Sequence, residues 1–255
     1  GNLWRASSLY SAAWNVQVRD NSESQRLLND VTLALTPDPT STPTLEPEPV
    51  VYAPPAPEPT ATPAMLSIAD FKGWILFRTD REGGLYIMQA DGSGRQLAPL
   101  DAFNQVEQLY DKEEWSPDGK SRIYVAASET KGANLFNIRL DLPENSERVF
   151  GFTDMAGDEY DPVWSPDNRL IAFVANSTGN DEIWSMNISG GDQRQLTYNG
   201  WEWDKHPSWS PDGQKLTFYS NRSGKRQIWV MNADGSAQIQ IGNGEYDEWD
   251  PIWIK

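Results

Sequence analysis

The chain has 255 residues, of which 12 are Trp and 38% are hydrophobic, so it can bury a sizeable core in one or two domains. Its formal net charge of −16 argues against nucleic acids and anionic membrane surfaces as partners. It contains no Cys, which excludes disulfides, thiol catalysis and thiolate metal sites. No apolar run approaches the roughly 18 residues of a transmembrane helix, so no membrane-spanning segment is expected in these residues.

Residues 1–35 have the pattern of a helical hairpin. The apolar residues of the first half recur at the spacing of one helix face: Ala6, Leu9, Tyr10, Ala13 and Trp14. Ser22 and Gln25 resemble a capping box before a second apolar series. Two short stretches also alternate as strands do, but the abundance of Ala, Leu, Gln and Arg favours helices. The segment resembles the last helix pair of a tetratricopeptide array.

Residues 36–64 are predicted to be a linker or a docking arm. The stretch is dominated by Pro, Thr and Glu, as in Thr36-Pro37-Asp38-Pro39 and Glu46-Pro47-Glu48-Pro49. Such a density of Pro prevents both helices and strand ladders and favours the extended polyproline II conformation. The arm is either a surface spacer or a segment that lies against the following domain or against another chain.

A five-residue motif recurs from residue 115 onwards. The three copies are Trp115-Ser116-Pro117-Asp118-Gly119, Trp164-Ser165-Pro166-Asp167-Asn168 and Trp209-Ser210-Pro211-Asp212-Gly213, and Pro251 to Lys255 is a degenerate fourth copy. Pro suits the second position of a β-turn, and the last position must tolerate positive φ, as Gly and Asn do. Each copy therefore predicts a strand with a buried Trp, a tight turn and a second strand, at the roughly 45-residue period of a propeller blade.

Each repeat continues with two further strands joined by a loop that contains Gly. The strand before this loop is rich in β-branched and aromatic residues: 74–77, 122–125, 170–173 and 215–218. The strand after it has the same character: 85–88, 135–138, 183–186 and 228–231. Turns such as Asn232-Ala233-Asp234-Gly235 then lead to a short outer strand.

The repeated motif, together with the stretch Ile228 to Ser236, resembles the TolB-type β-propeller repeat. This resemblance covers residues 71–255 and implies an all-β fold. The first unit lacks its Trp strand, whereas the chain ends with a surplus one, so we predict a four-bladed β-propeller closed by the C-terminal strand. The alternative is a half-ring that pairs with a second copy to make eight blades. The propeller domain is placed at residues 65–255, with blades at 71–109 plus 250–255, 110–158, 159–203 and 204–249.

An acidic pattern precedes each Trp, and the fourfold repeat predicts that its members gather at one mouth of the central channel. The members are Glu159, Asp161, Asp204, His206, Glu248 and Asp250, with Tyr110 and Lys112 at the equivalent places in the second unit. They form either a ligand or cation site, or a network that holds neighbouring blades together. In this alignment Lys112 is an internal counter-ion, which weakens the case for a metal.

Five aromatic residues are placed in the loops before the predicted innermost strands: Tyr160, Trp201, Trp203, Tyr246 and Trp249. They either contact a partner at one face of the propeller or pack between blades. His206 is the only histidine, and no Gly-x-Ser-x-Gly elbow accompanies it. We therefore expect no catalytic residues, metal or cofactor.

Two hypotheses of function follow, and neither is an enzyme. The first is an extracytoplasmic interaction or scaffold protein, located at the cell surface, in the periplasm or outside the cell, whose arm tethers the propeller into a larger assembly with protein partners or copies of itself. The second is a propeller that senses a cation or a small ligand at its channel mouth. The family resemblance also includes propeller lyases and peptidase caps, so an enzyme is the third hypothesis. It ranks last because one His cannot supply the metal-binding cluster of such a lyase.

Overall fold

The computed structural model describes residues 66–128 and 132–255. Within these ranges the chain consists of short strands in four antiparallel sheets, with one α-helix and one short 3-10 helix, η1 (Ile68–Phe71). The predicted helical segment of residues 1–35 and the predicted arm of residues 36–64 lie outside the described residues. No helix in the described ranges is long and apolar enough to cross a membrane.

The first sheet joins the two ends of the described chain. Its strands lie in the order β15 (Glu248–Trp253), β1 (Ile75–Thr79), β2 (Leu85–Met88) and β3 (Gln96–Leu97). β15 pairs antiparallel with β1, and Ile75 lies opposite Trp253. The prediction that the C-terminal strand completes the first blade is confirmed.

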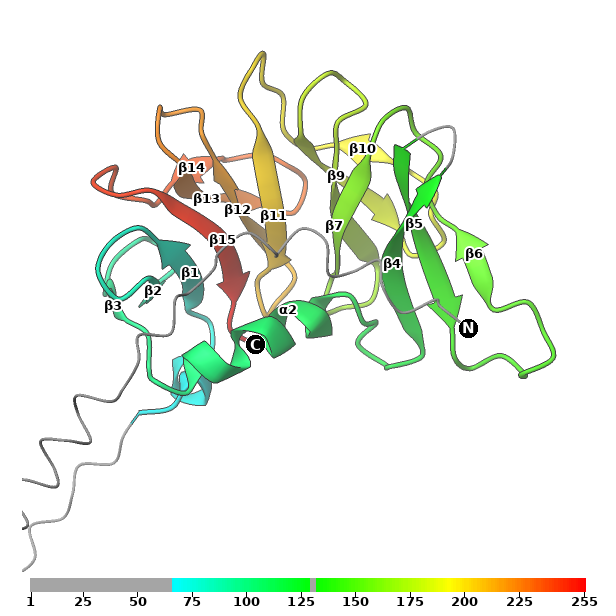
Figure 1. Ribbon diagram of the computed structural model, residues 1–255, viewed down its shortest axis with the longest axis horizontal. Coiled ribbons are helices and arrows are strands. Elements are labelled where there is room, and N and C mark those ends of the chain that lie inside the picture. The colour runs from blue at the N-terminus through cyan, green and yellow to red at the C-terminus, as the bar shows by residue number, and fades with distance from the viewer. Residues whose placement is uncertain (1–65, 129–131) are drawn as a thin grey trace, which may run out of the picture. The chain divides into compact units, whose positions relative to one another are not determined.

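The third and fourth sheets each form from one continuous stretch of chain. The third contains β7 (Glu159–Trp164), β8 (Leu170–Ala175), β9 (Glu182–Asn187) and β10 (Arg194–Gln195). The fourth contains β11 (Asp204–Trp209), β12 (Lys215–Ser220), β13 (Gln227–Asn232) and β14 (Ile239–Gln240). The Trp-bearing strands β7, β11 and β15 contact one another in that order (Figure 1). Each ends in a buried Trp, as the motif predicts.

The second sheet departs from the predicted repeat. It has three strands, β4 (Ser121–Ser128), β5 (Gly132–Arg139) and β6 (Val149–Gly151). The strand expected to carry Trp115 is not formed, and Trp115 makes a single isolated bridge to Arg122. The residues before Trp115 instead form the helix α2 (Ala102–Glu113), which the sequence analysis did not predict.

Helix α2 contacts all four sheets. Its residues are mostly good helix formers, and its buried side chains Ala102 and Val106 pack against the outer face of the first sheet. Towards its C-terminus, Glu113 accepts a hydrogen bond from Ser208 of the fourth sheet at 2.7 Å. The adjoining Glu114 accepts one from Arg122 of the second sheet at 2.8 Å. The helix also contacts β7 of the third sheet.

The apolar cores lie between neighbouring sheets. Tyr219 of the fourth sheet packs with Phe77 of the first, and Phe218 packs with Val174 of the third. Phe173 of the third sheet packs in turn with residues of the second. Full burial of one such side chain contributes roughly 1.5–3 kcal/mol, so these layers are the main stabilising feature.

The four sheets follow one another in the order second, third, fourth and first (Figure 1). Between the first and second sheets, no strand contacts of comparable extent occur among the described residues. The chain passes from one to the other through α2. The prediction of four propeller-like sheets, with the C-terminal strand in the first, is therefore confirmed. A closed ring would also bring the first and second blades into direct contact, and here α2 lies between them instead.

The Trp-Ser-Pro-Asp turns form as predicted. In the fourth sheet, the Ser210 hydroxyl donates to Asp212 at 2.6 Å and accepts from the backbone N–H of Lys215 at 2.9 Å. The last residue of each turn has positive φ: 68° at Gly119, 57° at Asn168 and 70° at Gly213. The requirement for Gly or Asn at this place is therefore confirmed.

Candidate functional site

Three of the sheets each direct one side chain to a common point. These residues occupy the third position of the Trp-bearing strands, precede a Pro and have positive φ: 49° for Asp161, 49° for His206 and 47° for Asp250. At each of them the strand shifts register against its neighbour, which is the signature of a β-bulge. Left-handed backbone before Pro is sterically unfavourable, so the surrounding sheets must hold it.

His206 lies between two carboxylates from the neighbouring sheets. Its Nε2 atom is 3.4 Å from Oδ2 of Asp161 and 3.4 Å from Oδ1 of Asp250. The Tyr219 ring stacks on the imidazole with a centroid distance of 5.7 Å, and Tyr110 of α2 approaches it edge-on at 6.3 Å. The imidazole is therefore fixed in orientation as well as in position.

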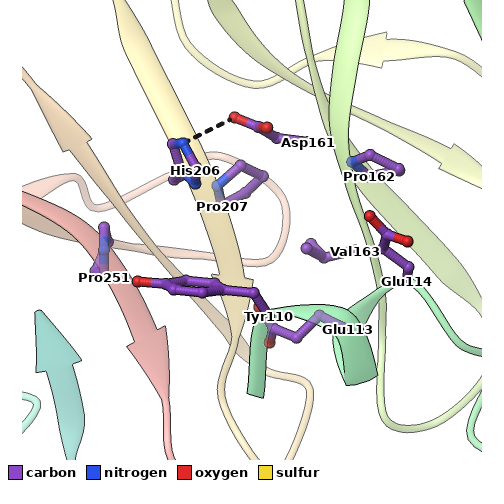
Figure 2. A pocket seen from close by; sticks show the side chains of 9 residues that line it. All are labelled: Tyr110, Glu113, Glu114, Asp161, Pro162, Val163, His206, Pro207 and Pro251. Atoms are coloured by element: carbon purple, nitrogen blue, oxygen red, sulfur yellow. Dashed lines mark ion pairs between the residues drawn. The ribbon is translucent and has the colours of Figure 1, made fainter. Parts of the chain in front are cut away.

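A cavity of about 100 Å³ opens beside this group (Figure 2). Its lining comprises three carboxylates, one phenol, one imidazole and four apolar residues: Glu113, Glu114, Asp161, Tyr110, His206, Pro162, Val163, Pro207 and Pro251. The α2 carboxylates already have cationic partners, because Lys255 donates to Glu113 at 2.5 Å and Arg122 donates to Glu114 at 2.8 Å. The buried Oδ2 atom of Asp161 makes no hydrogen bond, and the group facing it is the His206 imidazole, with Nε2 at 3.4 Å.

Burial controls the ionisation of this site. It raises the pKa of Asp161, and the nearby His206 partly opposes that shift. It also raises the pKa of the Tyr110 hydroxyl well above its usual value, together with the charge of Asp250. Tyr110 therefore stays a neutral donor, and its hydroxyl donates to the Asp250 carbonyl at 2.6 Å. The arrangement is suited to accepting a cationic or hydrogen-bond-donating group.

Metal binding gains no support from this geometry. No group of three or more His, Cys, Asp or Glu side chains in the described part of the chain is arranged to hold a metal ion. Asp161 and Asp250 contact the same imidazole nitrogen, so they flank His206 rather than share a free coordination centre with it.

The family model for the TolB beta propeller domain matches residues 114–254, which is more than half of the chain. The chain belongs to the TolB beta-propeller family. The match begins at Glu114, directly after α2, and extends through the C-terminal strand. The resemblance drawn from the Trp-Ser-Pro-Asp-Gly repeats is thereby confirmed.

Individual relatives of the propeller are distant. The chain is 35% identical to the uncharacterised protein Atu1656 of Agrobacterium fabrum over 94 residues, which are 36% of this chain and 30% of that protein. The chain thus spans about three-tenths of the length of this curated relative.

Solved structures with a similar fold include TolB proteins and an enzyme. A TolB-type protein from Agrobacterium tumefaciens is 22% identical, with a TM-score of 0.45 and coverage of 69% of each chain. TolB from Acinetobacter baumannii is 16% identical, with a TM-score of 0.34 and coverage of 67% of this chain and 51% of the other. An oligogalacturonate lyase from Vibrio parahaemolyticus is 11% identical, with a TM-score of 0.42 and coverage of 69% and 49%. Likeness at this level carries no functional argument.

The predicted acidic ring of the propeller divides into two sets. Asp161, His206 and Asp250 converge as described above. The other three predicted members are the first residues of β7, β11 and β15 and are almost fully buried: Glu159, Asp204 and Glu248. Arg222 donates to Asp204 and Arg95 donates to Glu248, each within the same sheet. This second set therefore has internal partners rather than lining the cavity.

Glu159 differs from its two counterparts because no arginine is paired with it. Its Oε2 atom accepts a hydrogen bond from Asn134 of the second sheet at 3.2 Å, and its buried Oε1 atom has no partner. Burial raises the pKa of Glu159. This residue bridges two sheets through a neutral amide.

Four of the five predicted aromatic residues are covered by cationic side chains of the propeller. Lys205 lies over Tyr160 and Trp203 at 5.6 and 5.3 Å, Arg81 over Tyr246 at 5.6 Å, and Arg226 over Trp249 at 4.2 Å. These contacts fit the interpretation that the aromatic residues pack within the domain. Trp201 is the exception, with 92% of its surface exposed.

Helix α2 supplies the site residues that the repeat pattern missed or misplaced. Glu113 and Glu114 were not predicted, and Tyr110 reaches the site from a helix rather than from an inner strand. Lys112 is exposed on α2, so the prediction that it serves as an internal counter-ion of the acidic ring is wrong. A signal was present in the sequence: the other units have Pro two residues before the Trp, whereas this unit has Glu113.

Proposed function

We propose that the chain is a non-catalytic, extracytoplasmic interaction protein whose propeller binds other proteins within a larger assembly. The observation that carries this proposal is the loop between β10 and β11. In it, Trp201 is 92% exposed and Tyr198 is 73% exposed. Large aromatic side chains left in water on a loop are typical binding anchors, because their burial by a partner contributes strongly to affinity.

Helix α2 completes the domain that carries this loop. Because the helix is bonded to the second and fourth sheets and packs on the first, it closes the fold where the second blade lacks an inner strand. We infer that this helix-sealed arrangement, rather than a ring sealed by strands alone, lets a single chain act as a self-contained binding domain.

Site-specific photo-crosslinking tests the proposed function. A photoreactive phenylalanine analogue would be placed at Trp201 in the full chain, expressed in its source cells, and at Ile188, which is 39% exposed in a hairpin, as a control. We expect a discrete crosslinked protein species from position 201 and none from position 188. An absence of adducts at position 201 in a folded, correctly localised chain would contradict the proposal.

The assembly role of the N-terminal residues is a separate part of the proposal. Light scattering coupled to size-exclusion chromatography, before and after deletion of residues 1–64, tests it. Loss of a higher-order species on deletion supports a tether, whereas a clean monomer in both cases counts against it.

A second candidate function is the sensing of a cation or small cationic ligand. It is favoured by the cavity beside His206, where the Oδ2 atom of Asp161 faces the imidazole at 3.4 Å but makes no hydrogen bond. Calorimetric titration with Ca²⁺ tests the cation version of this function, and neither heat nor a shift in melting temperature is the result that would remove it.

A further inference from the structure

Among the described residues, the second sheet has a free strand edge where the other three sheets have a paired one. In the third sheet, β8 is paired on one side with β9 and on the other with β7 along its length. In the second sheet, β4 is paired with β5, but its other edge is bonded only near its start, at Trp115 and its two neighbours. From Val125 onwards this edge has no strand partner among the described residues.

The backbone polarity of this edge follows from the register. The N–H of Ile123 donates to the carbonyl of Glu114 at 2.9 Å, so odd-numbered residues of β4 point away from β5. Because backbone groups alternate along a strand, the N–H and C=O groups of Val125 and Ala127 also point to the free edge. Natural edge strands are usually protected by Pro, Lys or a bulge, and residues 123–127 contain none of these.

By the fourfold repeat, the free edge of β4 corresponds to the fourth corner of the site, where α2 stands in place of an inner strand. Asp161, His206 and Asp250 come from equivalent positions of the other three sheets, and the second sheet contributes no such residue because α2 replaces its inner strand. Lys112, which the repeat pattern places at that corner, is exposed on the helix. The buried Oδ2 atom of Asp161 is left without a hydrogen bond.

A second buried group lacks its partner at the same boundary. In the fourth sheet, the indole N–H of Trp209 donates to the carbonyl of Val163 in the inner strand of the third sheet at 3.2 Å. Trp164, its counterpart in the third sheet, is 4% exposed and packs against the second sheet. Its indole nitrogen has no hydrogen-bond partner. The boundary between the second and third sheets is thus the less complete one.

We propose that an extended segment of a partner protein adds to the free edge of β4 as the missing inner strand and places a Lys or Arg side chain beside Asp161. This inference rests on the proposed interaction function and names its partner class: an extended, basic peptide segment. Strand addition provides backbone hydrogen bonds to Val125 and Ala127. The cation then joins His206 as a partner of the Asp161 carboxylate.

Charge distinguishes this occupant from a second copy of the chain. Each copy carries a formal charge of −16, so two copies repel each other overall. A basic segment has the opposite effect, and its association should weaken as salt is added.

The test uses the full chain and a fluorescein-labelled, C-terminally amidated peptide that copies residues 200–206, with Lys replacing His at the position of His206, so that it ends before the part of β4 already bonded to Glu114 and Trp115. A matched peptide carries Asp at this position. Fluorescence anisotropy should show saturable binding of the Lys peptide, at least about tenfold tighter than that of the Asp peptide, and a fall in affinity with rising salt.

Two pairs of protein variants locate the site. Ala127→Pro removes an edge N–H that β5 does not use, and Ala127→Ser retains it. The Pro variant should bind the Lys peptide about three- to tenfold more weakly than the Ser variant, the loss expected for one backbone hydrogen bond. Asp161→Asn should reduce the preference for Lys over Asp, whereas Asp234→Asn, in an exposed hairpin turn, should not.

Equal binding of the two peptides, no binding of either, or equal binding by the Ala127→Pro and Ala127→Ser variants would overturn the proposal. If the Ala127→Pro variant does not fold, the proposal is judged on the peptide preference of Asp161→Asn against that of Asp234→Asn. An unchanged preference for the Lys peptide in Asp161→Asn would then overturn it. Formation of a dimer that is lost in Ala127→Pro would instead identify a second copy as the occupant and overturn it as well. Because the crosslinking at Trp201 uses a different surface, adducts there without peptide binding would leave the interaction function standing and remove this site alone.

Discussion

At the scale of single residues, the turn after each Trp depends on backbone conformation more than on side-chain contacts. Asn168 has a φ of 57°, and its side-chain oxygen makes no hydrogen bond. The residue is therefore there because Asn tolerates the left-handed region, as the sequence pattern predicts. The Ser and Asp of the same turn provide the hydrogen bonds.

Substitutions at position 168 should separate these effects. Asn168→Ala should lower the free energy of unfolding by about 1 kcal/mol, because Ala pays a steric cost at positive φ, whereas Asn168→Gly should leave it nearly unchanged or raise it slightly. Urea unfolding followed by tryptophan fluorescence measures both. An Ala variant as stable as the Gly variant would contradict the argument.

Glu159 should make stability depend on pH. Its pKa in the folded chain is raised by burial above the unfolded value, so its favourable contribution is present below the unfolded pKa and is lost as pH rises through the folded pKa. Glu159→Gln should therefore gain stability relative to the wild type as the pH rises from about 4 to about 7. Urea unfolding at both pH values measures this gain.

Glu248→Gln is the matched control for Glu159. It leaves the largely buried Arg95 without its carboxylate partner, so it should be destabilising at pH 7, by about 2 kcal/mol. Similar behaviour of the two variants would mean that the missing arginine at Glu159 has no energetic consequence.

At the scale of secondary-structure elements, the repeats predicted the three regular blades because turn chemistry and alternation agree in each of them. The strand ends of β8, β9, β12 and β13 fall within a few residues of the predicted runs. The prediction for the second blade was wrong because the register of its inner strand was inferred from Trp115 alone. Residues 102–113 contain Ala, Leu, Gln and Glu, and the Pro of the other units is missing, so local helix preference outweighed the repeat.

The bulged site residues were partly predictable. The spacing before each Trp placed Asp161, His206 and Asp250 at equivalent positions, and the structure brings them together. The sequence spacing could not distinguish these three residues from Glu159, Asp204 and Glu248. The bulge that turns the first set toward the cavity depends on how neighbouring strands pair. The contribution of α2 depends on contacts between parts of the chain far apart in sequence.

Glu113 should be the main attachment point of α2. It is 6% exposed, and it accepts hydrogen bonds from Ser208 and Lys255, while Ser208 in turn accepts from the N–H of Trp253 at 2.9 Å. Glu113→Ala should therefore lower the free energy of unfolding by about 2 kcal/mol. Glu107→Ala, which breaks an exposed ion pair of the same helix with Arg78, should change it by less than about 1 kcal/mol. Chemical unfolding of both variants checks this difference.

At the scale of the whole molecule, the C-terminal strand holds the first and fourth sheets together. β15 pairs with β1 and also contacts β11 and β12. Its Trp253 indole donates to the carbonyl of Gly73 at 2.8 Å. The last residues of the chain are therefore part of the core that forms near its first described residues.

Removal of residues 248–255 should abolish cooperative unfolding, because it exposes one edge of β1 and one face of the core shared with the fourth sheet. Removal of Lys255 alone should lower the melting temperature by only a few degrees, since it breaks one ion pair. Thermal unfolding followed by circular dichroism distinguishes the two. A cooperative transition in the shorter chain would show that the first sheet does not need its C-terminal strand.

The central claim is that α2 replaces the inner strand of the second blade, so that the edge of β4 from Val125 onwards has no strand partner among residues 66–128 and 132–255. Amide hydrogen exchange at single-residue resolution tests it most directly, by comparing Val125 with its counterpart Val174, which lies opposite Tyr160 of β7. The account predicts that the amides of Val125 and Ala127 exchange at least about a hundredfold faster than that of Val174 in the chain alone. Equal protection of Val125 and Val174 would contradict it.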